Sequence, residues 1–365
     1  MTAKTRPAEK TSFITAMVRK QIFIPIAALL ILSIFNFIAD PTFFKITYGH
    51  NIEGNPVLSG NIISIIDYGS ELAILAIGMT LVTAASRGQD ISVGAAMAIS
   101  GSVVLRVLCG GNAHPESIQA PIIVAFLISC IAAMACGAFN GALVSIFKIQ
   151  PMVATLILFT AGRSIAAWIN NNELPVVNDK TFLCLGNVFP GVPVQTPVFI
   201  AILCFIVIWL VMKFTNLSLY VQSVGINEKT SRLNGLNPAL IKFITYVILG
   251  VCVAVAGFIK VARIGTINYS VVAKDIEMDA ILAVALGGNS LGGGKFNITG
   301  SVLGAYVIQF LTTTLYKLQV SSAALPAYKA VVVIVLVVMS APIFREKVAA
   351  LFKKLRSPEK AESKS

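Results

Sequence analysis

The sequence KFTNLSLYVQSVGINEKTSRLNGLNPALIK, from Lys213 to Lys242, is a mixed polar segment between two strongly apolar runs. Residues Glu228 to Leu233 favour a short helix, and Asn227 before them is a suitable N-cap. Gly235 and Pro238 follow as residues that end helices. The segment therefore predicts a short amphipathic helix between two membrane spans. Its composition fits both a solvated loop and a docking element.

The composition of the whole chain is that of a membrane protein. Of its 365 residues, 56% are hydrophobic and 12% are charged, whereas about a quarter of an ordinary soluble protein is charged. Apolar runs recur at lengths that approach or pass the requirement for a spanning helix. Because backbone amides in hydrocarbon must be paired within their own segment, and barrel-type strands are absent, we expect an all-α polytopic protein. The net charge of +12 lies at the chain ends and between apolar runs, which sets topology and does not indicate nucleic acid.

Ten apolar segments can be assigned as spans. Long polar loops are expected at residues 40–60 and 170–197. The eighth segment is short, and we expect it to cross as a short or broken helix. The ten segments are residues 22–39, 61–85, 91–108, 121–147, 151–169, 198–214, 238–261, 281–288, 298–316 and 327–343.

The distribution of positive charge predicts the topology. Residues 1–20 and residues 344–365 are both basic, so both ends are expected in the cytoplasm. Two cytoplasmic ends require an even number of spans within residues 21–343. With ten spans, most of the 28 lysines and arginines lie on the cytoplasmic side, including those of segment 213–242.

Two Gly-containing breaks interrupt the spans at similar places in the two halves of the chain. ELAILAIG at residues 71–78 resembles EMDAILAV at residues 277–284, and ISVGAAMAI resembles ITGSVLGAYVI after the breaks. Chance likeness between apolar helices is one explanation, while paired broken spans near a translocation path are the other. The candidate path residues at the breaks are Gly88, Asp90, Ser92, Gly94, Gly287, Gly288 and Asn289.

Polar residues inside the spans form a second candidate set. Asp90 precedes an apolar run and is expected to cap the following helix. An arginine at a helix centre costs roughly 2.5–3.5 kcal/mol on insertion scales. Arg163 therefore either anchors at the membrane interface or lines the path. Asn140, in GAFNGAL, either bonds between helices or contributes to the path.

The sequence argues against an enzyme and against a bound cofactor. The run GGNSLGGGKF lacks the pattern of a phosphate-binding loop, because Asn289 stands where glycine is required and Phe296 where Ser or Thr is required. His50 and His114 are isolated loop residues, so no Ser-His-Asp or Cys-His set is expected. Cys109 and Cys184 fall in expected loops, and the sequence leaves their pairing open.

Four motifs, in order, resemble those of a known family. The segment GMTLVTAASRGQDISVG resembles GMTxVxxxGGIDLSVGS, and YVQSVGINEKTSRLNGLN resembles YAiGgNexAArlsGin. The segments GAFNGALVSIFKIQPMVATLILFTAGRSIA and DAILAVALGGNSLGGGKFNITGSVLGA match two further family patterns. These motifs are similar to those of permease subunits of bacterial ATP-driven monosaccharide importers, the ribose, xylose and galactose group. Arg87 and Gln89 depart from the family pattern, which has Gly and Ile there.

The resemblance implies a ten-helix, type II importer-like permease with two pseudo-repeated halves in the bacterial inner membrane. It implies a second permease subunit, identical or different, a cytoplasmic ATPase, an extracytoplasmic sugar-binding protein and a small polar substrate within membrane lipid. In that family the segment after the sixth span docks the ATPase. On this chain the matching residues are Val224, Gly225, Asn227, Glu228, Arg232, Gly235 and Asn237. We expect the segment from Gly225 to Asn237 to act as the lever that couples ATPase closure to the spans.

Two rival functions remain at this point. An ion-coupled secondary transporter would need titratable groups at mid-membrane, whereas Asp67, Glu71, Asp90, Glu277 and Asp279 are expected mostly near span ends. A membrane scaffold would not need two Gly-interrupted breaks. ATP dependence of uptake separates the first rival from the importer.

Overall fold

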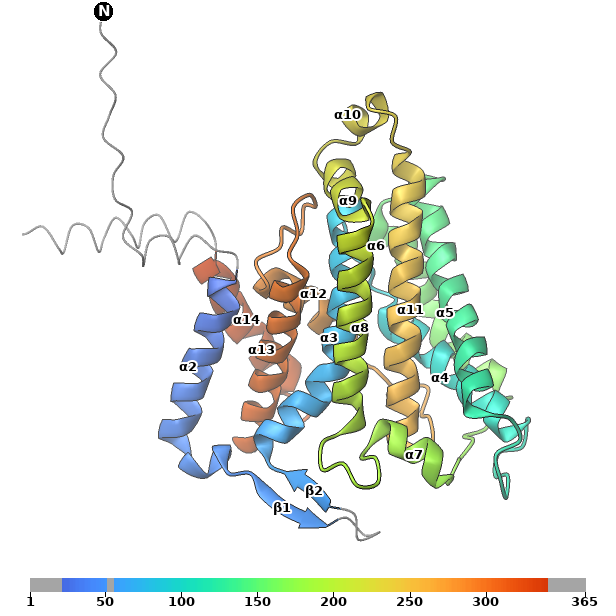
Figure 1. Cartoon of the computed structure of the whole chain (residues 1–365), viewed down its shortest axis with the longest axis vertical. Helices are drawn as coiled ribbons and strands as arrows, with labels where there is room; N and C mark the ends of the chain where they lie inside the picture. The colour runs from blue at the N-terminus through green and yellow to red at the C-terminus, as the bar shows by residue number, and fades with distance from the viewer. Residues whose placement is uncertain (1–21, 51–55, 341–365) are drawn as a thin grey trace, which may run out of the picture.

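The computed structural model describes residues 22–50 and 56–340, which form a bundle of helices with one small hairpin (Figure 1). The predicted basic ends, residues 1–20 and 344–365, lie outside the described residues. The chain is an all-α membrane protein. Ten helices correspond to the ten predicted spans: α2 (Phe23–Ala39), α3 (Asn61–Ser86), α4 (Val93–Cys109), α5 (Ile122–Ser145), α6 (Pro151–Ile169), α8 (Thr196–Phe214), α11 (Pro238–Ile264), α12 (Ile276–Leu286), α13 (Ile298–Lys317) and α14 (Leu325–Ser340).

These helices differ in their capacity to cross a bilayer. Within the described residues, α3, α5, α6, α8, α11 and α13 are long and apolar enough to do so, and α2 and α4 are shorter apolar helices. Helix α12 has 11 residues, well below the roughly 20 that a spanning helix needs. The eighth predicted segment is therefore a short helix, as expected, although it begins five residues earlier than the sequence indicated.

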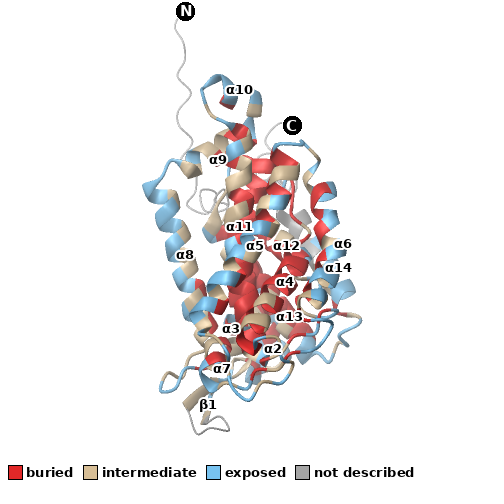
Figure 2. Cartoon of the chain, turned by 90° about the vertical axis from the view of Figure 1, so that its right-hand side faces the viewer, coloured by how far each residue is buried: buried red, intermediate tan, exposed pale blue. Residues whose placement is uncertain are grey.

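The bundle is arranged around α3, with apolar side chains on its outside. Residues 69–86 of α3 are all buried, and α11 and α13 pack against this helix. By contrast, only Pro197 and Ala201 are buried in α8, and Leu203 there is 61% exposed. Figure 2 shows this division, with α8 mostly exposed beside a buried centre. Since lipid replaces water around such a protein, the exposed apolar side of α8 marks a lipid-facing surface.

Several short elements occupy segments that the sequence assigned to loops. Helix α7 (Lys180–Gly186) lies in the expected loop 170–197, and the Asp179 carboxylate caps it by accepting from the Phe182 amide at 2.9 Å. The loop 40–60 contains a 3-10 helix (Pro41–Phe44) and the antiparallel strands β1 (Thr47–His50) and β2 (Pro56–Ser59), in which Thr47 pairs with Ser59. Cys109 ends α4 and Cys184 lies within α7, so both are helical and the loop assignment was wrong.

The two predicted breaks are real, and they touch each other. The first separates α3 from α4 at residues 87–92, and the second separates α12 from α13 at residues 287–297. The Gly294 amide donates to the Ala84 carbonyl at 2.9 Å, and the Gln89 side-chain amide donates to the Leu291 carbonyl at 3.2 Å. Two breaks far apart in sequence are therefore held together by hydrogen bonds.

Candidate coupling and translocation sites

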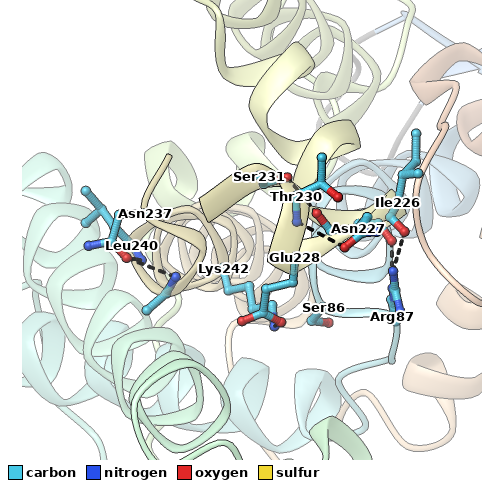
Figure 3. A network of polar contacts seen from close by, with 12 residues as sticks. Ser86, Arg87, Ile226, Asn227, Glu228, Thr230, Ser231, Asn237, Leu240 and Lys242 are labelled. Carbon is cyan, nitrogen blue, oxygen red and sulfur yellow. Dashed lines mark hydrogen bonds and ion pairs between the residues drawn. The ribbon is translucent and has the colours of Figure 1, made fainter. Parts of the chain in front are cut away.

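The predicted lever, Gly225 to Asn237, lies at one end of the bundle and contains α10 (Glu228–Leu233) and the last two residues of α9 (Leu217–Ile226) (Figure 1). The Asn227 side-chain oxygen caps α10 by accepting from the Thr230 amide at 3.1 Å. Gly235 has a φ of +80° just beyond the helix. Asn237 then caps α11 by accepting from the Ala239 amide at 3.1 Å (Figure 3). The bounds of α10 and its N-cap are as the sequence predicted.

The carboxylate of α10 pairs outside its own helix. Glu228 lies four residues before Arg232, yet its carboxylate forms an ion pair with Lys242 of α11 at 2.7 Å (Figure 3). The hydrogen bond from the Lys242 ammonium holds the pKa of the Glu228 carboxyl below its usual range. The pair joins α10 to a long helix, so α10 is braced from outside rather than along its own surface.

Helix α9 was missed by the sequence analysis, and one face of it, at Val221, Val224 and Gly225, is buried against the rest of the chain. Val221 and Val224 pack with Ala84, Ala85 and Ile241 in a small apolar cluster. A Cβ on Gly225 would stand 1.9 Å from the Ala84 carbonyl oxygen. Since no side chain fits at that distance, glycine is required where α9 meets the end of α3. Val224 and Gly225 therefore pack against the last turn of α3, just before the first break.

Arg87 ties α9 to that break. It stands at the C-terminal end of α3 in a left-handed conformation with φ of +57°. Its guanidinium donates through Nε to the Gly225 carbonyl at 2.6 Å and through Nη2 to the Ile226 carbonyl (Figure 3). Both carbonyls lie at the C-terminus of α9, where a helix concentrates partial negative charge. One side chain thus joins the lever to the spans.

The candidate path residues of the first break form a buried polar cluster. The Asp90 carboxylate accepts from the Ser92 amide at 2.8 Å and from the Ser92 hydroxyl at 2.7 Å. The Asn140 side-chain amide of α5 donates to Asp90 at 3.1 Å and to Ser92 at 2.8 Å. Asp90 was expected to be the N-cap, but Ser92 holds that position, and the Asp90 carboxylate closes the turn before it. Asn140 therefore forms hydrogen bonds between α5 and the first break, and bonding between helices was one of the two roles predicted for it.

The candidate glycines of both breaks lie at close approaches. A Cβ on Gly94 would stand 2.3 Å from a Glu277 carboxylate oxygen, so α4 and α12 meet there. Gly88 lies against Pro151 of α6. Gly287 ends α12 against Gly300, and Gly288 follows with a φ of +80°. Asn289 accepts from the Asn297 amide at 2.6 Å and donates to the Ser301 hydroxyl at 2.8 Å, which closes the second break.

Arg163 neither reaches outward nor lines the breaks. From α6 its guanidinium donates to the Tyr269 carbonyl at 3.0 Å and to the Val272 carbonyl at 2.7 Å. Both carbonyls belong to the connection between α11 and α12. Arg163 thus fixes this connection, a role that differs from the interface anchor predicted as one alternative.

Two acidic residues of α3 are buried inside the bundle. Asp67 and Glu71 are buried well inside α3. Glu71 pairs with Lys260 at 3.1 Å and with Arg263 at 2.8 Å, and Arg263 also binds Asp67. The sequence analysis expected the acids mostly near span ends and gave no sign that these two side chains are buried, because burial depends on helices distant in sequence.

A cavity of about 830 Å³ opens beside this ion cluster. Its walls come from the first residues of α3, the last residues of α11 and α13, and the start of α12. Since α11 begins beside α10, the last residues of α11 lie at the other end of the bundle (Figure 1). The cavity and the lever therefore lie toward opposite ends, with the joined breaks toward the lever.

Comparison with known proteins decides the family. Residues 61–341 match the family model of the permease component of branched-chain amino acid transport systems. The chain belongs to this permease family. The permease is 34% identical to a fructose import permease of Bifidobacterium longum over 93% of each chain. It is 38% identical to a galactofuranose transporter permease of Escherichia coli over 83% of this chain and 85% of the relative. A ribose import permease of Escherichia coli is 35% identical over 76% and 85%.

The family membership confirms the resemblance inferred from the four motifs. The relatives are permeases for monosaccharide import, so the permease is a transport protein of the sugar-importer kind. Its multi-pass helices and its relatives agree with a location in the bacterial inner membrane.

Sequence reasoning missed the residues of this permease that act over long distances. Arg87 was noticed only as a departure from the family pattern, and that departure was the available signal. The partner of Glu228 could not be read, because Lys242 lies 14 residues away on another helix. The position of Glu71 on the cavity wall had no local signal at all.

Proposed function

We propose that this permease is the transmembrane subunit of an ATP-driven importer that moves a monosaccharide or related small polar solute into the cytoplasm. ATP hydrolysis belongs to a partner subunit, and an extracytoplasmic binding protein delivers the sugar. Two permease subunits, identical or different, form the membrane part. Both termini lie in the cytoplasm. The relatives, which include import permeases for fructose and ribose, support the substrate class.

One observation carries the coupling part of the proposal, namely the exposed face of α10. Leu233 of α10 is 88% exposed, and Lys229 and Arg232 beside it are exposed as well. A capped helix that holds a large apolar side chain in the open beyond the bundle fits a docking element better than a solvated loop. The residues for contact with the ATPase are therefore Glu228, Arg232 and Leu233.

The route of the coupling follows the contacts behind α10. Glu228 and Lys242 brace α10 against α11, and α9 packs on α3 with Val224 and Gly225 at the contact. Arg87 then links α9 to the first break, and Gly294 links that break to the second. A push on α10 thus reaches Asp90, Ser92, Asn140 and Asn289 through short bonds. This set, with Gly88, Gly94, Gly287 and Gly288, is the proposed moving part of the path, and Arg163 contributes by holding the connection between α11 and α12.

The directions of the outer helices support a cytoplasmic position for both termini. Helix α2 runs from the α9–α10 end of the bundle toward β1, and α14 runs back toward that end (Figure 1). The described chain therefore starts and ends toward the end that carries the proposed ATPase contact.

The test is ATP-dependent uptake by the full complex in proteoliposomes. Labelled D-fructose, D-ribose and D-galactose are offered with and without internal ATP. We expect one of them to accumulate only with ATP, and Leu233→Asp to abolish both uptake and sugar-stimulated ATP hydrolysis while the permease still inserts. The control is Leu318→Ala, at an exposed leucine after α13. Leu203 of α8 is exposed too, but Leu203→Asp would place a charge on the lipid-facing side. Uptake driven by a proton or sodium gradient without ATP would overturn the proposal.

The ion-coupled alternative is favoured by one observation, the burial of Asp67 and Glu71 in α3. Arg263 pairs with both carboxylates, however, and Lys260 pairs with Glu71, so the cluster holds its own fixed counter-charges. This arrangement fits a permanent wall better than an ion site that fills and empties.

A further inference from the structure

The cavity has the size and the hydrogen-bonding groups of a site for a small polar ligand. Its volume of about 830 Å³ lies in the range of roughly 300–1,000 Å³ that is typical of ligand pockets. Hydroxyl and carboxamide groups both donate and accept hydrogen bonds, so they suit a molecule with a hydroxyl on nearly every carbon. The uncharged polar residues that line it include Asn61, Ser64, Gln309, Thr312, Thr313 and Tyr316.

The charges on the cavity wall decide which polar ligand fits. Lys260 pairs with Glu71 at 3.1 Å, and Lys329 pairs with Asp279 at 2.7 Å, all four being lining residues. A third lining lysine, Lys317, pairs with Asp40 at 3.1 Å. The ammonium groups of these three lysines are thus already neutralised by carboxylates of the chain itself.

An anionic ligand would have to compete with these carboxylates. The Glu71 side chain is 2% exposed, so displacing it from Lys260 would leave the two buried carboxylates of Asp67 and Glu71 to share Arg263 alone, with one negative charge in excess. A neutral sugar hydroxyl can accept from the lysine and donate to the carboxylate without breaking either pair. The remaining lining lysine, Lys274, is exposed at the rim.

We propose that this cavity binds a single neutral monosaccharide during transport, and that the pairs Lys260–Glu71 and Lys329–Asp279 exclude anionic sugars such as aldonic acids. The site belongs to the permease itself and adds a second selection step after the binding protein. The direction of transport rests on the proposed function, whereas the binding site does not.

The first experiment measures protection of a cysteine placed in the cavity. Ser64→Cys is nearly isosteric and lies on the cavity wall, and Ser117→Cys, exposed between α4 and α5, is the matched control. Membranes that contain the full complex are labelled with a charged methanethiosulfonate reagent, and labelling of the unsubstituted chain is subtracted. We expect millimolar D-fructose, D-ribose or D-galactose to slow labelling at position 64 and not at position 117. We expect D-gluconate to have no effect at either.

The second experiment removes the carboxylate partner of one cavity lysine at a time. Asp279→Asn, combined with Ser64→Cys, leaves the Lys329 ammonium without its carboxylate. D-gluconate should then protect position 64, with its half-protecting concentration lowered about tenfold or more. Asp279 is more accessible than Glu71, so this variant avoids the buried cluster. Glu71→Gln makes the same test for the other pair, because it removes the carboxylate partner of Lys260.

Two outcomes overturn the proposal. One is protection of the Ser64→Cys protein by D-gluconate as strong as that by the neutral sugars, with no change in Asp279→Asn. The other is a sugar that the complex takes up with ATP but that gives no protection. Protection by a neutral sugar with uptake that does not need ATP would leave the site in place and overturn the importer assignment instead.

Discussion

Helices α9 and α10 are neighbours in the same connection, yet they belong to different environments. Val221 and Val224 of α9 are buried among residues of α3 and α11, whereas Leu233 of α10 is 88% exposed. Helix α10 is held by its own cap and one ion pair, and α9 by close packing and by Arg87. The connection is thus divided into two parts: α10 is the receiving part, which makes the proposed contact with the ATPase, and α9 is the transmitting part, which packs on the spans. Damage to the two parts should therefore have different signatures.

The largest effect is expected at Gly225, in the transmitting part. In Gly225→Ala the new Cβ would stand 1.9 Å from the Ala84 carbonyl oxygen, so α9 must move off α3. Overpacking of this kind typically costs about 1–3 kcal/mol, and we expect lower thermal stability and loss of transport together. Melting of the purified complex and uptake in proteoliposomes measure the two. Gly235→Ala, where no atom lies within 4 Å of the new Cβ, should cost only its backbone strain, about 1 kcal/mol.

The next effect separates coupling from stability, through Arg87→Gly. This change removes two hydrogen bonds to α9 but relieves a left-handed backbone that costs a non-glycine residue about 1–2 kcal/mol. We expect melting to change little while sugar-stimulated ATP hydrolysis and uptake fall about tenfold. Gln319→Gly is the matched control, since Gln319 also has a left-handed φ, +62°, and an exposed side chain. Equal losses in both variants would contradict a specific role for Arg87.

A smaller effect is expected in the receiving part, at Glu228. Glu228→Lys places a second cation beside Lys242, so α10 should lose its brace to α11 and present the wrong charge to the ATPase. Because the pair is partly exposed, we expect a stability change of less than about 1 kcal/mol and a several-fold loss of coupled ATP hydrolysis. Glu228→Gln should give an intermediate loss. Full coupled activity of an assembled Glu228→Lys complex would remove this residue from the lever.

The pH dependence of the Glu228–Lys242 pair follows from the direction of the pKa shift of Glu228. The folded-state pKa of Glu228 is lowered by Lys242, so the stabilisation is present above the ordinary carboxyl pKa. It is lost as the pH falls through the lowered value. Throughout the neutral range, wild-type and Glu228→Gln complexes should therefore show parallel pH profiles of ATP hydrolysis. Profiles that converge between weakly acidic and neutral pH would contradict this assignment.

The smallest effect is expected at the cap of α10. Asn227→Ala removes the bond to the Thr230 amide, and loss of an N-cap costs about 1 kcal/mol. Because α10 keeps the Glu228–Lys242 brace, transport should fall less than twofold. Asn227→Ser, which can still cap, is the control, and uptake rates of the two variants measure the difference.

The same contrast shows what could be read from the sequence. The bounds of α10 were predicted because Asn227 and Gly235 act on amides and carbonyls within a few residues. The ten apolar helices and both breaks were predicted for the same reason, since apolar length and glycine are local signals. Helix α9 was missed because its stability comes from packing on Ala84 and Ile241. The links from Arg87 to Gly225, 138 residues away, and from Glu71 to Lys260 have no local signal.

The shortness of α12 has a consequence for the distance that a sugar must be moved. The cavity reaches the first turn of α12, at Ile276 and Asp279, and the second break begins at its last turn. The 11 residues of α12 rise about 16 Å, roughly half of the 30 Å hydrocarbon thickness. About three helical turns of α12 therefore separate the cavity from the second break. In the proposed importer, each ATPase cycle would have to open this layer rather than a channel through the whole bilayer.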